Sequence, residues 1–286
     1  MISAFCPAHI TCFFRPVHSE NILEKGSRGV GIRLASGTTV HMDEIRGSTK
    51  IRINGKADGA KITRHVLEHM APGRSFDVDA ECGLPLGQGF GMSASGAVAA
   101  ALCVSELTGK SRKEAFEAAH TADAVCGGGL GDVAGLMHDG DVPIRVKAGL
   151  PPFGRVTDRG ITFEGITLVV LGRKLSTAGV LGDAGISKRI CGAGDKVVDE
   201  FFEFGTKDLL FEMSDRFSSE AGIRGPAVAE AMRILEENGI RSSMCMLGNS
   251  IFTDVPEEEV RGVLGDRGRI FRTSSTGEPA RVTRKA

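Results

Sequence analysis

The sequence predicts an α+β fold built from two domains, and three observations support that prediction. The chain has 286 residues, which exceeds the usual length of one domain. Short strand patterns broken by Gly, Pro and Ser fill the first 80 residues, whereas long helical patterns occupy much of the second half. Because strands and helices do not alternate regularly, an α+β architecture fits better than a doubly wound parallel sheet.

The first predicted domain covers residues 1–148. Its expected strands occupy residues 3–5, 10–14, 31–35, 38–42, 50–53 and 75–80. Its expected helices occupy residues 59–70, 95–107 and 111–125. The last of these begins at a capping box formed by Ser111 and Glu114. A short segment at residues 130–136 follows a run of glycines.

The second predicted domain covers residues 149–286, and the segment at its start, residues 147–152, is rich in Gly and Pro. Its expected strands occupy residues 167–171, 243–247, 250–254 and 269–273. Its expected helices occupy residues 185–204, 206–218, 225–238 and 257–264. The polar tail from Ser274 is expected to be frayed.

Composition and charge exclude several classes of function. The formal net charge is −1, so the chain lacks the basic excess that attracts nucleic acids or anionic membranes. No apolar run approaches the roughly 20 residues that cross a bilayer. The 7 cysteines are dispersed without a CxxC pair, which indicates reduced thiols rather than disulfides or a structural zinc site. We therefore expect a cytoplasmic protein with a small-molecule partner, and neither a nucleic-acid nor a membrane partner.

A glycine-rich turn leads into the Ala-rich helix predicted at residues 95–107, and we expect it to bind phosphate. The candidate residues are Pro85, Gly87, Gln88, Gly89, Phe90, Gly91, Met92, Ser93, Ala94, Ser95 and Gly96. Glycines let the backbone approach a ligand closely, and the free N–H groups at a helix start favour an anion. No Lys or Arg occurs between residues 75 and 109. Backbone amides and a metal ion would therefore have to neutralise the phosphate, and Ser93 can offer its hydroxyl to Mg²⁺.

Other interpretations of this turn stay open at this point. Gly89, Gly91 and Ala94 match the spacing of a dinucleotide fingerprint, but that fingerprint needs an acidic residue at the end of the next strand. Here Glu114 and Glu117 lie inside a predicted helix instead. A Walker A loop requires Gly-Lys-Ser or Gly-Lys-Thr, which the sequence lacks. A purely structural glycine turn is the remaining alternative.

Two acidic residues follow the turn at a spacing that suits phosphoryl transfer. His120 and Asp123 share one face of the predicted helix, and Asp132 ends the glycine-rich segment that comes after it. One carboxylate can take a proton from a substrate hydroxyl, and a second can hold magnesium. Taken singly, Asp123 could be a solvated charge and Asp132 a helix N-cap. Together with the phosphate turn, they supply the positioning, metal and base that phosphoryl transfer needs.

These motifs resemble those of the GHMP kinases, the family of galactokinase, homoserine kinase and mevalonate kinase. The family's P-x-G-x-G-L-G-S-S-A motif is similar to residues 85–94, its N-terminal motif to residues 7–11 and its C-terminal glycine motif to residues 243–250. Within the family, the chain most resembles the archaeal pantoate kinases. The residues that carry this resemblance are Gly26-Ser27-Arg28-Gly29, residues 89–97, His120 with Asp123, Gly131-Asp132-Val133 and Met246-Leu247-Gly248-Asn249-Ser250.

The resemblance implies an N-terminal α+β nucleotide lobe, a C-terminal ferredoxin-like lobe and ATP between them. It implies that Ser93 and Asp123 hold Mg²⁺ and that Asp132 acts on the substrate hydroxyl. It implies phosphorylation of (R)-pantoate at its primary hydroxyl on the route to coenzyme A. The alternatives are a kinase of another hydroxy acid, such as homoserine or mevalonate, and a catalytically silent nucleotide-binding protein. A homodimer is expected from the family only.

The carboxylate of pantoate favours an arginine, so Arg28 and Arg145 are the candidates to bind it. The other candidate substrate residues are His9, Ser27, His120, Gly248 and Asn249. Three positions depart from the family pattern. His9 stands where several members have a lysine, Asp123 where glutamate is commoner, and Met92 in place of the first serine of a Ser-Ser pair.

Overall fold

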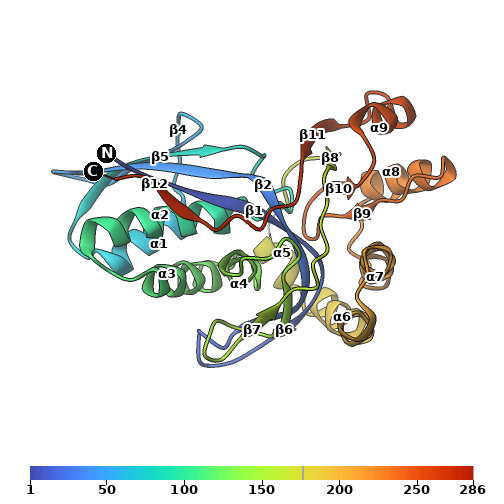
Figure 1. Ribbon diagram of the computed structural model, residues 1–286, viewed down its shortest axis with the longest axis horizontal. Coiled ribbons are helices and arrows are strands. Elements are labelled where there is room, and N and C mark those ends of the chain that lie inside the picture. The colour runs from blue at the N-terminus through green and yellow to red at the C-terminus, as the bar shows by residue number, and fades with distance from the viewer. Residues whose placement is uncertain (176, 286) are drawn as a thin grey trace.

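The computed structural model describes residues 1–175 and 177–285, and it has two lobes that share one long strand (Figure 1). Strand β1 (Ile2–Val17) begins in the N-terminal lobe and ends against helices of the C-terminal lobe. Its apolar residues up to Cys6 belong to one hydrophobic core, and those from Ala8 to Phe14 belong to the other. A side chain midway along β1 therefore lies where the two cores meet.

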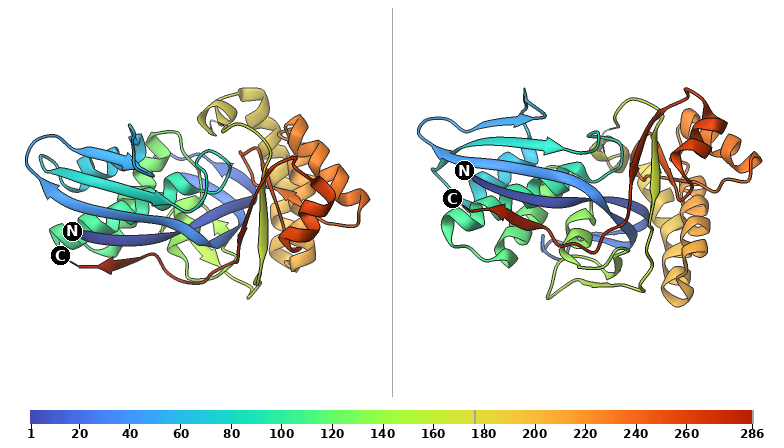
Figure 2. Two further views of the ribbon diagram at one scale, coloured as in Figure 1. Left: turned by 90° about the horizontal axis from the view of Figure 1, so that it is seen from above. Right: turned by 45° about the horizontal axis from the view of Figure 1, so that its top comes forward.

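The N-terminal lobe is a mixed sheet with the strand order β12-β1-β2-β5-β3-β4, and β6 pairs with β2 and with β7. Its other strands are β2 (Gly26–Ile45), β3 (Lys50–Ile53), β4 (Lys56–Ala57), β5 (Ser75–Cys82), β6 (Ile144–Lys147), β7 (Arg155–Thr157) and β12 (Arg281–Arg284). Its helices are α1 (Lys61–Met70), α2 (Met92–Thr108), α3 (Arg112–Val125) and α4 (Asp132–Met137). The helices lie behind the sheet when it is seen from above, and the two chain ends lie together (Figure 2).

The packing of α2 and α3 sets the position of the candidate site. Helix α2 contacts β1 and β2 as well as α1 and α3, so its Ala-rich sequence is buried on nearly all sides. The predicted capping box of Ser111 and Glu114 is present at the start of α3. Because the connection between the two helices is short, they are antiparallel neighbours. The start of α2 and the end of α3 therefore lie at the same end of the lobe.

The C-terminal lobe is an antiparallel sheet with helices packed against it. Its strands are β8 (Ile166–Val170), β9 (Ser243–Met244), β10 (Ser250–Thr253) and β11 (Arg269–Thr273). Its helices are α5 (Thr177–Leu181), α6 (Ala184–Phe204), α7 (Lys207–Glu220), α8 (Pro226–Glu237) and α9 (Glu257–Leu264). The strand order β11-β8-β10-β9 and the antiparallel pairing confirm the predicted ferredoxin-like arrangement. No helix in the described ranges is both long and apolar enough to cross a membrane.

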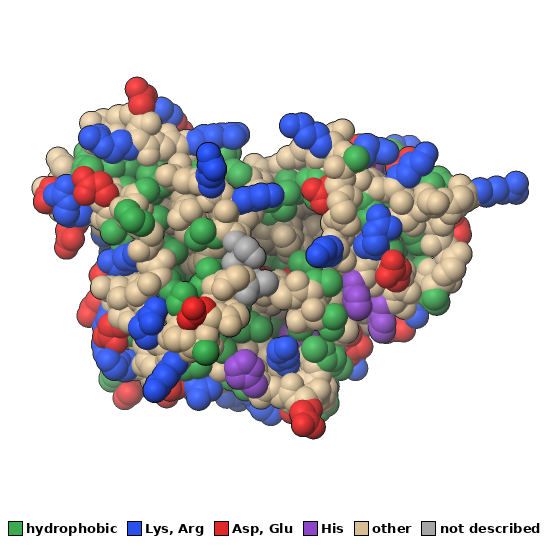
Figure 3. Space-filling view, turned by 180° about the vertical axis from the view of Figure 1, so that it is seen from behind, with side chains coloured by type: hydrophobic (Ala, Val, Ile, Leu, Met, Phe, Trp, Pro, Cys, Tyr) green, Lys and Arg blue, Asp and Glu red, His purple; other side chains and the backbone are tan. Residues whose placement is uncertain are grey.

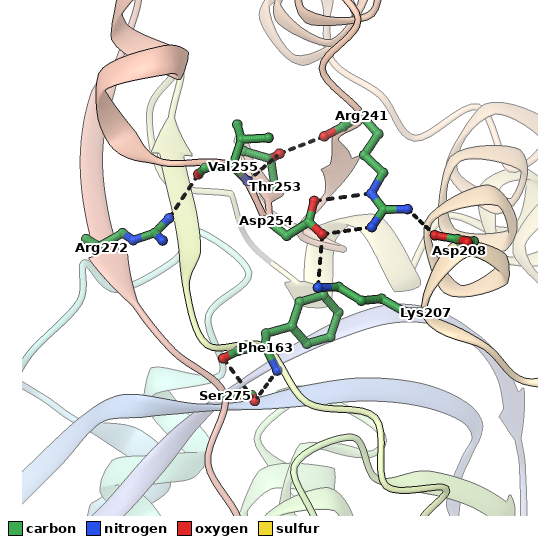
Figure 4. Close-up of polar contacts among 9 residues, drawn as sticks. All are labelled: Phe163, Lys207, Asp208, Arg241, Thr253, Asp254, Val255, Arg272 and Ser275. Carbon is green, nitrogen blue, oxygen red and sulfur yellow. Dashed lines mark hydrogen bonds and ion pairs between the residues drawn. The ribbon is translucent and has the colours of Figure 1, made fainter.

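A polar network ties β10 to α7 in this lobe (Figure 4). Asp254 is 13% exposed and lies 2.8 Å from Arg241 and 3.0 Å from Lys207. Arg241 also pairs with Asp208, and the Lys207 ammonium lies 4.3 Å from the centre of the Phe163 ring. Burial acts to raise the pKa of Asp254, but hydrogen bonds from Arg241 and Lys207 bring that pKa to about 2. The network therefore stabilises the fold while Asp254 is ionised.

Two expectations from the sequence differ from the structure. The tail from Ser274 was expected to be frayed, and this is wrong: β12 pairs with the start of β1, and Arg33 donates to the Glu278 carbonyl. The short strands expected within residues 3–42 are two continuous strands, since Pro7 and Gly37 lie at an irregularity in the pairing of β1 with β2 and not at a break. The predicted domain boundary near residue 148 stays a prediction.

Candidate active site

A cavity of about 280 Å³ lies between the glycine-rich turn, the end of α3 and the C-terminal lobe. Figure 3 shows a side of the molecule on which the surface is hollowed between the lobes. The cavity is lined by Thr11, Phe14, Ser27, Ile62, Gly87, Gly89, Phe90, Gly91, Met92, Ser93, Ala94, Asp123, Cys126, Gly127, Gly128, Gly129, Leu130, Gly131, Asp132, Leu175, Leu181, Met246 and Leu247. Within the described part of the chain, its wall has no Lys or Arg.

The glycine-rich turn at residues 87–91, here called the phosphate loop, forms one wall of this cavity. Gly87, Gly89 and Gly91 have φ angles of 72°, 77° and 62°, which residues with a Cβ rarely adopt. Gly91 is the N-cap of α2, and no side chain caps this helix, so its first N–H groups are left to bind an anion. A Cβ on Gly91 would lie 2.5 Å from the carbonyl oxygen of His9. The loop therefore packs directly on β1.

Asp132 begins helix α4 and lies at the edge of the cavity. Its Oδ1 is 2.8 Å from Nδ1 of His9 and 3.4 Å from the hydroxyl of Thr11, both on β1. Burial acts to raise the pKa of Asp132, but the hydrogen bond and charge interactions with His9, Arg145 and Thr11 outweigh it and lower that pKa. Asp132 is therefore ionised at neutral pH and ready to accept a proton or a hydrogen bond.

Asp123 and Ser93 face the cavity from the end of α3 and the start of α2. Asp123 is 3% exposed, and in the described part of the chain its Oδ1 has no hydrogen-bond partner. Burial, followed by the charge of Asp132, raises the pKa of Asp123 well above its ordinary value. A Cβ on Gly128 would lie 1.9 Å from this Oδ1, so a larger residue there would displace the carboxylate. A buried carboxylate oxygen without a partner calls for a cation or a proton.

Arg145 on β6 and Ser27 on β2 lie together behind Gly131. Arg145 is 1% exposed, and none of its three guanidinium nitrogens has a hydrogen-bond partner among the residues that the structure describes. A Cβ on Gly131 would lie 2.5 Å from Nε of Arg145 and 2.5 Å from the hydroxyl of Ser27. Burial lowers the pKa of Arg145 to about 10, so the side chain keeps its charge at neutral pH. A buried, unpaired guanidinium beside a cavity is a site for an anionic group of a ligand.

Comparison with known proteins shows which family this chain belongs to. The model of the GHMP kinases N terminal domain matches residues 60–140, which contain the phosphate loop, Asp123 and Asp132. Pantoate kinase of Thermococcus kodakarensis is 36% identical over 273 residues, which cover 91% of this chain and 89% of that protein. The chain belongs to the pantoate kinase family. Pantoate kinase of Methanocaldococcus jannaschii is 29% identical over 266 residues, 91% of this chain and 95% of its own.

Solved structures place this pantoate kinase family member in the GHMP kinase fold. A structure described as a phosphotransferase related to the CoA biosynthesis pathway superimposes with a TM-score of 0.87 at 31% identity, covering 99% of this chain and 98% of the other. A mevalonate kinase superimposes with a TM-score of 0.64 at 16% identity, which shows the shared fold alone. The predicted two-lobed α+β fold is thus confirmed.

Most of the predicted nucleotide residues line the cavity, and four do not. Gln88 donates to the carbonyl of Gly172, and Ser95 donates to the carbonyl of Cys6. Both side chains therefore fix the loop and the start of α2 to neighbouring backbone. Pro85 and Gly96 also lie outside the wall. The prediction therefore covered the whole sequence motif, although only part of a motif can face the ligand.

The predicted substrate residues lie in several places. Ser27 lines the cavity and Arg145 lies beside it, whereas Arg28 turns away to pair with Asp199 at 2.6 Å and to stack on Phe202.

His9, His120 and the glycine motif have structural contacts instead. His9 lies behind Asp132, and Nε2 of His120 is 3.0 Å from the carbonyl of Ile22. Gly248 packs on the Gln88 carbonyl, and Asn249 donates to the carbonyl of Arg173. None of these four predicted residues is part of the cavity wall.

Several wall residues were not predicted from the sequence. Thr11 shares with His9 one face of β1, since residues two apart in a strand point the same way, and that spacing could have identified it. Met246 and Leu247 belong to the C-terminal glycine motif, of which the prediction named Gly248 and Asn249 instead. Ile62 and Cys126 have no local sequence signal, because only the packing of α1 and α3 brings them to the cavity.

Proposed function

We propose that the chain transfers the γ-phosphoryl group of ATP to the primary hydroxyl of pantoate, with Asp132 as the base. The observation that carries the proposal is the buried, unpaired guanidinium of Arg145 beside Ser27 and Asp132. Pantoate has a carboxylate at one end and a primary hydroxyl at the other. A carboxylate bound by Arg145 would leave the hydroxyl end of the molecule for Asp132.

The phosphate loop and the start of α2 bind the phosphates of ATP in this proposal. Without Lys or Arg in the described wall, the backbone N–H groups and the helix dipole supply the attraction. The positive φ angles at Gly87, Gly89 and Gly91 bring the backbone close to the ligand. Such a cradle fixes the direction of the γ-phosphoryl group relative to the acceptor, and phosphoryl transfer depends chiefly on this positioning.

Mg²⁺ fits the residues beside the loop. Ser93 offers an exposed hydroxyl, and Asp123 offers a buried carboxylate oxygen without a partner, both hard oxygen ligands. Within the described residues, no three His, Cys, Asp or Glu side chains gather into a metal site of their own, which agrees with an ion that is shared with substrate phosphates. When bound, Mg²⁺ neutralises charge on the phosphates.

Asp132 accepts the hydroxyl proton as the reaction proceeds. The hydroxyl oxygen forms a bond to the γ-phosphorus, the bond from that phosphorus to the β–γ bridging oxygen breaks, and ADP leaves with the electron pair. The lowered pKa of Asp132 keeps it ionised before the transfer. Changing Asp132 to Asn should lower kcat by on the order of 10²–10⁴ and leave ATP binding nearly unchanged. Near-normal turnover by this variant would remove the assignment of the base.

ADP release with a panel of acceptors tests the substrate. Pantoate, pantothenate, homoserine, mevalonate and shikimate are each supplied with ATP and Mg²⁺, and ADP is measured in a coupled assay. The proposal expects pantoate to give the highest kcat/KM. If homoserine or mevalonate is turned over and pantoate is not, the chain is a kinase of another hydroxy acid. If ATP binds but no acceptor leads to ADP release, the protein is catalytically silent.

A further inference from the structure

His9 is completely buried in β1 and does not line the cavity, so it has no direct path to a substrate. Its ring is held between two glycines. A Cβ on Gly31 would lie 2.1 Å from Nε2, and a Cβ on Gly135 would lie 2.7 Å from the same atom. A side chain at either position would collide with the ring, so the imidazole of His9 depends on both glycines for its place.

The contacts of the ring assign its protons. Nδ1 lies 2.8 Å from Oδ1 of Asp132, whereas Nε2 is buried and has no hydrogen-bond partner within residues 1–175 and 177–285. Burial lowers the pKa of His9, and the positive charges of Arg145 and Arg33 act in the same direction, while Asp132 opposes them. The imidazole is therefore neutral. Because a carboxylate accepts hydrogen bonds, the proton is on Nδ1, and Nε2 carries none.

The carboxylate of Asp132 is held from one side only. His9 and Thr11 both donate to Oδ1. The other oxygen, Oδ2, lies on the side of the cavity wall, since a Cβ on Gly129 would be 2.3 Å from it. Two donors on one oxygen fix the rotation of the carboxylate and leave the second oxygen to face a ligand.

We propose that His9 is a positioning residue for phosphoryl transfer, whose Nδ1–H holds Asp132 with Oδ2 toward the substrate hydroxyl. The inference rests on the proposed role of Asp132. A lysine at this position would add a positive charge. His9 adds none, and it acts on the reaction only through Asp132.

Two variants of His9 separate the hydrogen bond from the packing of the ring. His9→Asn keeps an N–H near the place of Nδ1, whereas His9→Leu fills similar space without a donor. We expect His9→Leu to lower kcat by about 10², within the range that proton-transfer groups contribute. The KM values for ATP and pantoate should change less than about threefold, because His9 touches neither ligand. His9→Asn should recover most of the lost kcat. Equal loss in both variants, or no loss in a folded His9→Leu protein, would overturn the proposal.

The double variant with Asp132→Asn shows whether His9 acts through Asp132. In that background His9→Leu should cause no further loss of kcat, because the two residues form one unit. Two independent, multiplying losses would contradict the proposal. A harmless Asp132→Asn change would instead refute the proposed base, so the two failures are distinct.

Nitrogen-15 NMR of the histidine rings in the wild-type protein gives an answer that does not depend on any variant folding. The expected signature of His9 is a neutral ring with a protonated Nδ1 and a bare Nε2. A proton on Nε2, or a doubly protonated ring at neutral pH, would overturn the inference.

Discussion

Replacing Arg145 by Met removes a buried charge whose guanidinium makes no hydrogen bond within the described residues of the free protein. The guanidinium is 1% exposed, and burial lowers its pKa to about 10. One pKa unit corresponds to about 1.4 kcal/mol, so the charged side chain costs the folded state about 3 kcal/mol. Methionine has a similar length and no charge. Arg145→Met should therefore stabilise the ligand-free protein by up to this amount, a rise in Tm on the order of 5 °C.

The same change should remove the binding of pantoate. Loss of one partner from a buried charge pair costs roughly 2–5 kcal/mol, so the KM for pantoate should rise by on the order of 10² or more. The KM for ATP should stay nearly unchanged. Thermal unfolding with and without pantoate measures both effects, because pantoate should raise the Tm of the wild-type protein and leave that of the variant unchanged.

Arg28→Met is the matched control for this experiment. Arg28 is partly exposed and already paired with Asp199, so its loss should alter neither the Tm nor the KM for pantoate by much. A variant at Arg145 that is less stable and binds pantoate normally would refute the reasoning. A large rise in the KM for pantoate in the Arg28 variant would assign the carboxylate to Arg28 instead.

Three further changes test other parts of the account. Gly91→Ala would place a Cβ 2.5 Å from a carbonyl oxygen and should lower kcat/KM for ATP at least tenfold. Its control is Gly109→Ala, which also has a positive φ but has open space around the added Cβ. This control should lower the Tm in thermal unfolding and leave kcat/KM unchanged. Asp123→Asn should raise the Mg²⁺ concentration needed for half-maximal ADP release by about tenfold or more, and an unchanged Mg²⁺ titration would contradict this. Asp254→Asn should lower the free energy of unfolding by roughly 1–2 kcal/mol at neutral pH, as urea titration would measure. The pKa of Asp254 in the folded state is depressed to about 2. The wild-type protein should therefore have the larger free energy of unfolding above about pH 4, and this difference from the variant should vanish as the pH falls toward 2.

The sequence predicted the elements around the site well, because their signals are local. The capping box at Ser111 begins α3 as expected, and the glycine-rich turn leads into α2. The C-terminal strand was missed for a physical reason. Residues 281–284 are mostly polar and gain their order from pairing with β1, a contact between opposite ends of the chain that no local pattern contains.

The types of residue in the site were predictable, but their partners were not. Asp123 and Asp132 were chosen from spacing and chemistry, and both line the cavity. His9 was expected to bond a hydroxyl of the substrate, whereas the fold puts the ring behind Asp132. Arg28 and Arg145 were both candidates to bind the carboxylate of pantoate. The structure distinguishes them, because Arg28 is already in an ion pair whereas Arg145 is buried without one among the described residues, and this difference comes from the packing of β2 and β6.

Phosphorus-31 NMR of the product formed from ATP and pantoate is the most direct test of the proposed reaction. Phosphate on the primary hydroxyl is attached next to a CH₂ group, so its signal should be a triplet from coupling to two protons. A doublet, from coupling to one proton, would place the phosphate on the secondary hydroxyl, and no ester signal at all would contradict a pantoate kinase activity for this chain.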